Sequence, residues 1–256
     1  MKANKLPRRV LILGGVTEGY LLAEALVDQT RFHPISSLAG RTEHPRTPVG
    51  ETRIGGFGGV DGLRAFLRER DIDAVVDATH PFADTMGQHA ALACEGAPGN
   101  KKTPLLRLER PAWMPQPGDQ WYPVADWDQA IAVLKAQGAR RVLLALGARE
   151  LAPFSTLTYT WFLARTVTRP DPMPPFVAAE LLVARGPFGL DQELKLLRDH
   201  QIDTIVCRNS GGDGAAAKLT AARELGVQVI MRERPPRPPL PTVATVAEAL
   251  DWLGEM

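Results

Sequence analysis

The sequence predicts an α/β protein with doubly wound parallel sheets, and three observations support this fold class. Short apolar runs of strand length alternate with segments whose apolar residues recur at the spacing of a buried helical face. Most of the short runs end in glycine or a polar residue, as strands do at the ligand-binding edge of an open α/β sheet. A proline-rich stretch at residues 110–118 interrupts the alternation, so we expect two halves, residues 1–113 and 114–256.

The first half contains five expected strands with helices between them. The strands lie at residues 10–13, 34–39, 52–54, 74–76 and 105–108. Leu22 and Leu26 mark the buried face of the first helix, and Asp61 can cap the second. Pro81 suits the first turn of a third helix that runs to Cys94.

The second half repeats the alternation. Its expected strands lie at residues 141–146, 161–165, 181–185, 204–207 and 227–230. Patterns typical of helix starts begin at Asp126 and Thr245, and an alanine-rich helix ends near Gly226. Residues 71–79 and 201–209 share an Ile-Asp turn, a buried strand and a polar strand end, which hints at two similar halves.

Composition excludes several classes of protein. The chain has 256 residues, 45% of them hydrophobic, and a formal charge of +1, so no overall field favours nucleic acid or a membrane surface. No apolar run is long enough to span a membrane, the two cysteines form no CxxC motif, and the five histidines show no metal-ligand spacing. We therefore expect a cytoplasmic protein without metal, membrane or nucleic-acid partner, and nothing indicates more than a monomer.

A glycine-rich turn, GGVTEG, joins the first strand to the first helix. Gly14 and Gly15 would let the backbone approach a phosphate, and the helix start at Thr17 and Glu18 favours negative charge. The dinucleotide fingerprint GxGxxG is not matched, and an ordinary strand-to-helix turn is the alternative interpretation.

The next two strand ends support a dinucleotide site. The second strand is followed by Arg41 and Thr42 with no acid before Glu43, which suits the 2′-phosphate of NADPH better than the free ribose of NADH. A solvated loop arginine is the alternative. The third strand leads into residues 55–59, GGFGG, where Gly56 allows either close approach of a ligand or a flexible tip.

The fourth strand of the first half ends in a polar segment that opens a helix. This segment contains Thr79, His80, Pro81 and Phe82. His80 is a candidate proton donor, because its unperturbed pKa of about 6.5 lies near neutrality. The alternative, which the pattern favours somewhat more, is that Thr79 and His80 cap the helix and contact the cofactor.

The second half offers a possible anion cradle. Asn209, Ser210, Gly211 and Gly212 precede a helix that carries Lys218, so backbone N–H groups and a cation meet at one helix start. A helix capped by Asn or Ser is an equally good interpretation of the spacing. Three further cations lie near strand ends: Arg149, Arg165 and Arg185. Trp113, Trp121 and Trp161 could form a flat apolar wall, although buried tryptophans usually belong to the core.

Taken together, these motifs resemble the precorrin-6A reductases of cobalamin biosynthesis. The blocks that carry the resemblance cover nearly the whole chain, at residues 12–18, 37–42, 55–59, 77–83, 106–113, 185–188 and 209–218. Members of the family often have Lys where this chain has Arg208. The charge is kept there, but a guanidinium meets a carboxylate with a different geometry.

The resemblance implies two Rossmann-like domains with the active site in the cleft between them. Residues 1–113 would bind NADPH and residues 114–256 the substrate, a macrocycle with many carboxylates. The implied reaction is hydride transfer from NADPH to a ring carbon of precorrin-6A, followed by protonation of the adjacent carbon. The implied cofactor-binding residues are Gly14, Gly15, Thr17, Glu18, Arg41, Thr42, Gly56, Thr79, His80, Pro81 and Phe82. The implied substrate-binding residues are Arg149, Arg185, Asn209, Ser210, Gly211, Gly212 and Lys218.

Two other functions fit parts of the sequence. A non-catalytic NADP-binding redox sensor would use the first half but gives no role to the cradle around Asn209 and Lys218. An NADPH-dependent reductase of another polycarboxylated substrate fits the same residue chemistry, and only the resemblance disfavours it.

Overall fold

The computed structural model describes residues 6–40, 47–96 and 102–256, which form two compact units. Unit 1 comprises Met1–Pro111 and Pro235–Met256, and unit 2 comprises Ala112–Arg234. The prediction that the second half extends over residues 114–256 is therefore wrong at its C-terminal end. Residues 235–256 return to unit 1 because their strand pairs with its sheet and their helix packs on its first helix.

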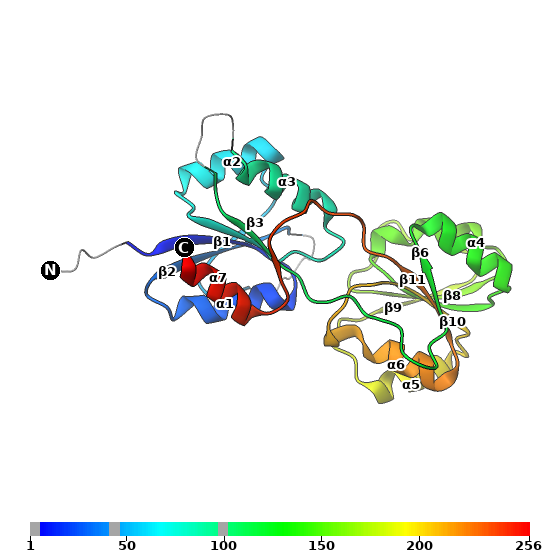
Figure 1. The fold of residues 1–256 in the computed structure, drawn as a ribbon. Helices are drawn as coiled ribbons and strands as arrows, with labels where there is room; N and C mark the ends of the chain where they lie inside the picture. Colours follow the sequence, from blue (N-terminus) through cyan, green and yellow to red (C-terminus); the bar gives the residue numbers. More distant parts are fainter. Residues whose placement is uncertain (1–5, 41–46, 97–101) are drawn as a thin grey trace. The chain divides into compact units, whose positions relative to one another are not determined.

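Unit 1 is a six-stranded parallel sheet in the order β12-β5-β4-β1-β2-β3. The strands are β1 (Arg8–Leu13), β2 (Phe32–Leu38), β3 (Glu51–Ile54), β4 (Ala74–Asp77), β5 (Leu105–Leu108) and β12 (Thr242–Val243). Helices α1 (Thr17–Val27) and α7 (Val246–Glu255) cover one face, and α2 (Val60–Glu69) and α3 (Asp84–Cys94) cover the other (Figure 1). Side chains alternate along β1, so Val10 and Ile12 pack under α1 and α7 while Leu11 and Leu13 pack under α2 and α3.

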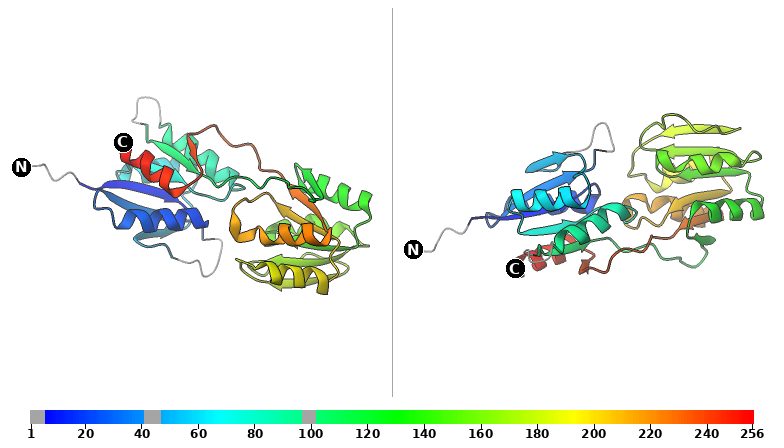
Figure 2. Two further views of the ribbon diagram at one scale, coloured as in Figure 1. Left: turned by 60° about the horizontal axis from the view of Figure 1, so that its bottom comes forward. Right: turned by 90° about the horizontal axis from the view of Figure 1, so that it is seen from above.

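Unit 2 is a second six-stranded parallel sheet, in the order β6-β11-β10-β7-β8-β9. Its strands are β6 (Trp121–Val124), β7 (Arg141–Ala145), β8 (Trp161–Thr166), β9 (Ala179–Val183), β10 (Thr204–Arg208) and β11 (Gln228–Arg232). Helix α4 (Trp127–Gln137) and the short turn η2 (Ala152–Thr156) cover one face. Helices α5 (Leu190–Asp199) and α6 (Ala217–Leu225) cover the other, and Figure 2 shows each unit from two further sides.

Five strands of each sheet share one order, β5-β4-β1-β2-β3 and β11-β10-β7-β8-β9, and two parallel sheets covered by helices on both faces confirm the predicted fold class. Along these five strands the chain starts in the middle of the sheet, winds outward, and returns to the other side of the starting strand, whereas the remaining edge strand is the last strand of unit 1, β12, and the first strand of unit 2, β6. The order reverses between β1 and β4 in unit 1 and between β7 and β10 in unit 2, and ligands of such sheets bind at these reversals. Residues 71–79 and 201–209 lead into and out of the equivalent strands β4 and β10, so the similarity between them reflects equivalent positions in the two folds.

The sixth strand of each sheet was not expected from the sequence. Strand β6 contains Pro123, which lacks the N–H that a central strand needs, and it lies at the sheet edge. Strand β12 has two residues, too few for a visible hydrophobic pattern. Helix α3 also begins later than predicted, at Asp84, because residues 81–83 form a turn in which the Ala83 N–H bonds to the His80 carbonyl oxygen.

Two further properties hold for the part of the chain that the structure describes. None of its helices is both long enough and apolar enough to cross a membrane. Within the same residues, no three His, Cys, Asp or Glu side chains lie together as metal ligands would.

Candidate functional site

The turn after β1 leaves an uncapped helix start at the strand reversal of unit 1. Gly14 donates its N–H to the Ser37 carbonyl oxygen at 3.0 Å, and Gly15 has a φ of 129°. Helix α1 follows from Thr17, and no side chain caps it. A Cβ on Gly19 would lie 3.3 Å from the Cα of Gly14, so glycine lets the helix approach the turn closely. Free amides and the helix dipole at this point suit the phosphates of a dinucleotide.

Glu18, in the first turn of α1, is neutralised by a partner from another strand end. Its carboxylate lies 3.0 Å from Arg110, and both side chains are largely buried. Arg110 follows β5, so the pair ties the helix start to the opposite side of the strand reversal. A compensated Glu18 is compatible with a nearby anion, which a free carboxylate would repel.

Gly56 lies at the neighbouring strand end, after β3. It is exposed, its φ is not positive, and a Cβ there would touch nothing within 4 Å. Neither backbone conformation nor packing against the described residues therefore accounts for glycine at this position. A ligand that approaches the backbone would account for it. Arg41 and Thr42 lie outside the described residues.

The polar end of β4 is built around a buried carboxylate. Asp77 is fully buried and accepts hydrogen bonds from the Thr79 hydroxyl at 2.6 Å and from the Thr79 N–H at 3.1 Å. Arg237 donates to Asp77 at 2.6 Å, to Thr79 at 3.2 Å and to Glu109 at 2.8 Å. Sequence reasoning missed Arg237, because it lies 160 residues from Asp77 and no local pattern links the two.

His80, Pro81 and Phe82 form the turn that follows Thr79. The His80 Nδ1 accepts the Phe82 N–H at 3.2 Å, so the neutral ring carries its proton on Nε2. Pro81 is buried and Phe82 is half-buried, with its ring centroid 5.8 Å from that of His80. The structure thus brings Thr79 and the His80 turn to the strand reversal that Gly14 and Gly15 also border.

In unit 2, Asn209 uses its side chain to hold Trp113. Its Oδ1 accepts the Trp113 N–H at 2.8 Å, and its Nδ2 donates to the Trp113 carbonyl oxygen at 3.0 Å. The Trp113 indole N–H donates to the Gly212 carbonyl oxygen at 2.8 Å. Gly211 and Gly212 have φ values of 68° and 72°, which favour glycine. Arg234 completes the arrangement by binding the carbonyl oxygens of Asn209 and Ser210.

Lys218 lies inside this arrangement and is 5% exposed. It is the second residue of α6, and its Nζ donates to the Ala215 carbonyl oxygen at 2.6 Å. The ammonium also lies 4.4 Å from the centre of the Trp113 ring, a favourable cation–π distance. Burial lowers the pKa of Lys218 below its usual range.

The other cations of unit 2 fall into two groups. Arg165 forms a buried ion pair with Glu193 at 2.8 Å and stacks on Phe188, and Arg208 lies 3.1 Å from Glu150. Arg149 and Arg185 are exposed, and among the described residues neither has an ion pair or hydrogen bond to its guanidinium. These two arginines are therefore available to an anionic ligand.

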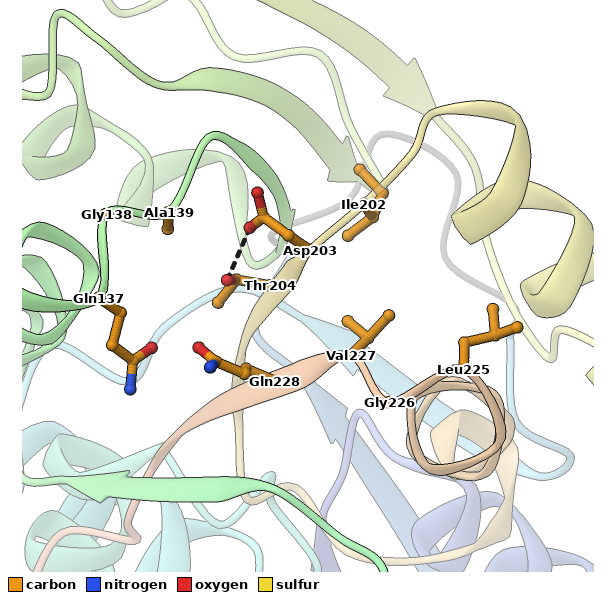
Figure 3. A pocket seen from close by; sticks show the side chains of 10 residues that line it. All are labelled: Gln137, Gly138, Ala139, Ile202, Asp203, Thr204, Leu225, Gly226, Val227 and Gln228. Carbon is orange, nitrogen blue, oxygen red and sulfur yellow. Dashed lines mark hydrogen bonds between the residues drawn. The ribbon is translucent and has the colours of Figure 1, made fainter.

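A hollow of about 390 Å³ lies at the amino ends of the strands of unit 2 (Figure 3). Its Asp203 carboxylate accepts the Thr204 hydroxyl and the N–H groups of Arg140 and Arg141, so its polar groups serve the turn. Open α/β sheets bind ligands at the carboxyl ends of their strands, which is the opposite edge. We therefore do not assign this hollow to the site.

Comparison with known proteins identifies the family. The profile of the precorrin-6x reductase family CbiJ/CobK matches residues 9–254. The chain belongs to this family. Precorrin-6x reductases are oxidoreductases of cobalamin biosynthesis, and membership confirms the resemblance found in the sequence.

Relatives and a solved structure support membership in the precorrin-6x reductases over most of the chain. The precorrin-6A reductase of Rhodococcus erythropolis is 47% identical over 229 residues, covering 89% of this chain and 90% of its own. That of a Sinorhizobium species is 42% identical over 249 residues, covering 96% and 94%. A solved structure described as CobK precorrin-6A reductase is 42% identical, covers 97% and 96%, and superposes with a TM-score of 0.89.

Proposed function

We propose that this protein uses NADPH to reduce one ring double bond of precorrin-6A. Hydride is added to a ring carbon and a proton to the adjacent carbon, so the ring gains two electrons and NADPH becomes NADP⁺. The observation that carries the cofactor assignment is the uncapped start of α1 beside Gly14 and Gly15 at a strand reversal. Family membership carries the assignment of the substrate.

The residues of unit 1 fit a dinucleotide. Amides of Gly15, Thr17 and Glu18 would hold the pyrophosphate, with Gly14 allowing close approach. Arg41 and Thr42 would bind the 2′-phosphate through charge-assisted hydrogen bonds. Gly56 and the Thr79–His80 turn would border the remainder of the molecule. NADPH, when bound, supplies the hydride, and the protein orients the two reacting rings.

Unit 2 would hold the carboxylates of the macrocycle. Arg149 and Arg185 have exposed guanidinium groups suited to carboxylates, and Ser210, Gly211 and Gly212 contribute polar groups next to an uncapped helix. Asn209 and Lys218 would contribute by shaping this surface, because their polar groups already bind Trp113 and Ala215.

His80 is the candidate source of the proton. Its Nδ1 accepts the Phe82 N–H, so the imidazolium that would donate a proton from Nε2 forms only when Nδ1 is protonated and this hydrogen bond is given up. His80→Gln tests this role. Proton donation predicts a fall in kcat of roughly 100-fold, whereas a capping role predicts a raised KM for NADPH with little change in kcat.

The overall activity is tested by following the absorbance of NADPH after precorrin-6A is added to the purified protein. Stoichiometric consumption supports the reductase, and binding of NADPH without consumption supports a redox sensor instead. Arg41→Ala tests the choice of cofactor. We expect the preference for NADPH over NADH to fall, and an unchanged preference would show that Arg41 does not bind the 2′-phosphate.

A further inference from the structure

The loop after β3 is held by a side chain that the proposed function does not use. Arg53 is the third residue of β3, and its register partner on β2 is Ser37. Its Nη1 donates to the Ser37 hydroxyl at 2.8 Å and to the Gly55 carbonyl oxygen at 3.0 Å. Its Nη2 donates to the Gly56 carbonyl oxygen at 3.0 Å. One planar group thus joins the end of β2 to two successive residues of the loop.

Two aromatic rings fix the plane of this guanidinium. It lies 3.9 Å from the ring centre of Phe57 and 5.3 Å from that of Phe66, and the two rings meet edge to face with centroids 5.2 Å apart. The partial burial that results lowers the pKa of Arg53. A stacked and desolvated guanidinium with three acceptors has little rotational freedom, so its acceptors are held in place as well.

The loop itself needs such support. Gly55, Gly58 and Gly59 have φ values of 119°, 81° and 93°, a backbone that glycine adopts readily and equally readily leaves. Among the residues that the structure describes, a Cβ on any of these three would meet nothing within 4 Å, so packing against them does not hold the loop at these positions. The contacts of Arg53 and the Gly55 N–H bond to the Leu38 carbonyl oxygen, 2.9 Å, anchor its first part.

Arg53 is also linked, through Ser37, to the turn after β1. The Ser37 hydroxyl accepts from Arg53, while the Ser37 carbonyl oxygen accepts the Gly14 N–H at 3.0 Å. A continuous set of hydrogen bonds therefore runs from Gly14 through Ser37 and Arg53 to Gly56. This set of hydrogen bonds connects the two glycine segments that border the proposed cofactor position.

We propose that Arg53 is a positioning residue for the dinucleotide, which holds the Gly55–Gly56 backbone in register with the Gly14 turn without contacting the cofactor. The inference rests on the proposed NADPH site. The proposed role of Arg53 depends on the planar geometry of its guanidinium and not on its charge alone. We therefore expect that lysine at this position does not restore the function of arginine. An ammonium cannot donate in one plane to Ser37 and two carbonyl oxygens while it lies flat on Phe57.

The test compares NADPH binding, measured by the fluorescence of the reduced nicotinamide, in Arg53→Ala, Arg53→Lys and a matched control. Arg70→Ala is the control, because Arg70 also packs on Phe66 and pairs with Glu51 of β3 but touches no loop residue. We expect Kd and KM for NADPH to rise about tenfold in both Arg53 variants, with kcat at saturating NADPH within twofold of the wild type. Arg70→Ala should bind as the wild type does.

The choice between NADPH and NADH separates positioning from direct contact. We expect the ratio of the two affinities to stay the same in Arg53→Ala, and a collapse of this ratio would overturn the inference by making Arg53 a ligand of the 2′-phosphate. Wild-type affinity in folded Arg53→Ala or in Arg53→Lys would overturn it as well.

If Arg53→Ala does not fold, Ser37→Ala provides a second test, because it removes only one acceptor of the Arg53 guanidinium. We expect this variant to raise the Kd for NADPH about threefold, and an unchanged Kd would count against the inference. Failure of the wild type to bind NADPH would overturn the proposed function and this inference with it.

Discussion

Buried charges at the strand ends of unit 1 are compensated by one residue from the C-terminal segment. Asp77 is fully buried, and Arg237, 5% exposed, is its close ionic partner, while the Arg107 Nε lies 3.9 Å away. Arg237 also reaches Glu109, so a single guanidinium serves the ends of β4 and β5. It lies against Gly87 of α3, where a Cβ would come within 2.5 Å of Nη2. Its position is therefore fixed from several sides.

Arg237→Met should destabilise unit 1 strongly. The substitution leaves Asp77 buried without its close partner, and breaking a buried pair in this way costs about 3–5 kcal/mol. Denaturant unfolding measures the change, with Arg68→Met, at an exposed position of α2, as the control. The double variant Arg237→Met/Asp77→Asn should recover part of the loss. A loss below about 1 kcal/mol in Arg237→Met, within the range of surface pairs, would contradict this account.

Lys218→Met should be neutral or stabilising at pH 7, because burial disfavours the ammonium. Folding lowers the pKa of Lys218 below its usual value near 10.5. At pH values between these two pKa values, the unfolded state therefore binds more protons at Lys218 than the folded state does. The wild type should therefore gain stability relative to Lys218→Met as the pH rises through this interval. Unfolding free energies of both proteins from pH 7 to 10 measure this difference. A difference that is constant with pH would show that burial does not perturb Lys218.

Residue types at strand ends could be predicted from the sequence, but their partners could not. Gly14, Gly15 and Asn209 stand at the strand reversals as expected, because alternation of strands and helices fixes where strands end. Arg237 lies 160 residues from Asp77, and Trp113 lies 96 residues from Asn209. Such contacts depend on which elements become neighbours, which no local pattern encodes. Asn209 was expected to bind the substrate, but its side-chain amide bonds to the backbone of Trp113, a neighbour that the local sequence does not reveal.

At the scale of elements, the two units build the turns before the equivalent strands β4 and β10 in the same way. Asp71 and Gln201 are the non-glycine residues with positive φ among those described, at 46° and 50°. Two residues later, Asp73 accepts the Arg9 N–H, and Asp203 accepts the N–H groups of Arg140 and Arg141. The short sequence similarity between residues 71–79 and 201–209 thus marks a shared turn. The similarity could be detected from the sequence because the positive-φ residue and the aspartate lie within three residues of each other, whereas only the N–H donors come from distant parts of the chain.

Asp73→Ala and Asp203→Ala should destabilise their own units to different extents. Each removes hydrogen bonds to backbone groups, and bonds to charged acceptors contribute about 1.5–3 kcal/mol. Asp203 accepts two N–H groups and the Thr204 hydroxyl, so we expect the larger loss there. Chemical denaturation measures both, with Asp128→Ala on the surface of α4 as a control for loss of charge. Equal losses in the two variants would contradict the expectation that the additional hydrogen bonds of Asp203 contribute to stability.

At the scale of the whole molecule, unit 1 is completed only by the last part of the chain. Strand β12 pairs with β5, and α7 packs on α1, placing Ala249 and Leu253 in the same core as Val10 and Ile12. The alternation of elements could predict that these C-terminal elements exist. It could not predict the sheet they join, because five strands of each sheet share one order and each sheet offers an equivalent edge, at β5 or at β11, to an additional strand.

Leu253→Ala tests whether the C-terminal helix supports the proposed cofactor site. Leu253 is fully buried in unit 1, and a cavity at such a position costs about 2–5 kcal/mol. Leu134→Ala, buried in α4, is the matched substitution in unit 2. Trp252 is the tryptophan of unit 1, and the other four belong to unit 2, so comparison with Trp252→Phe separates their unfolding signals.

We expect Leu253→Ala to lower the denaturant midpoint reported by Trp252 and to leave the signal of the other tryptophans in place, with the reverse for Leu134→Ala. NADPH at 100 times its Kd should add about 2.7 kcal/mol to the unit that binds it. Its addition should therefore raise the Trp252 transition in the wild type and offset part of the loss in Leu253→Ala. If NADPH instead raised the transition of unit 2, the cofactor would belong to the other sheet, since a ligand stabilises the unit whose folded state it binds.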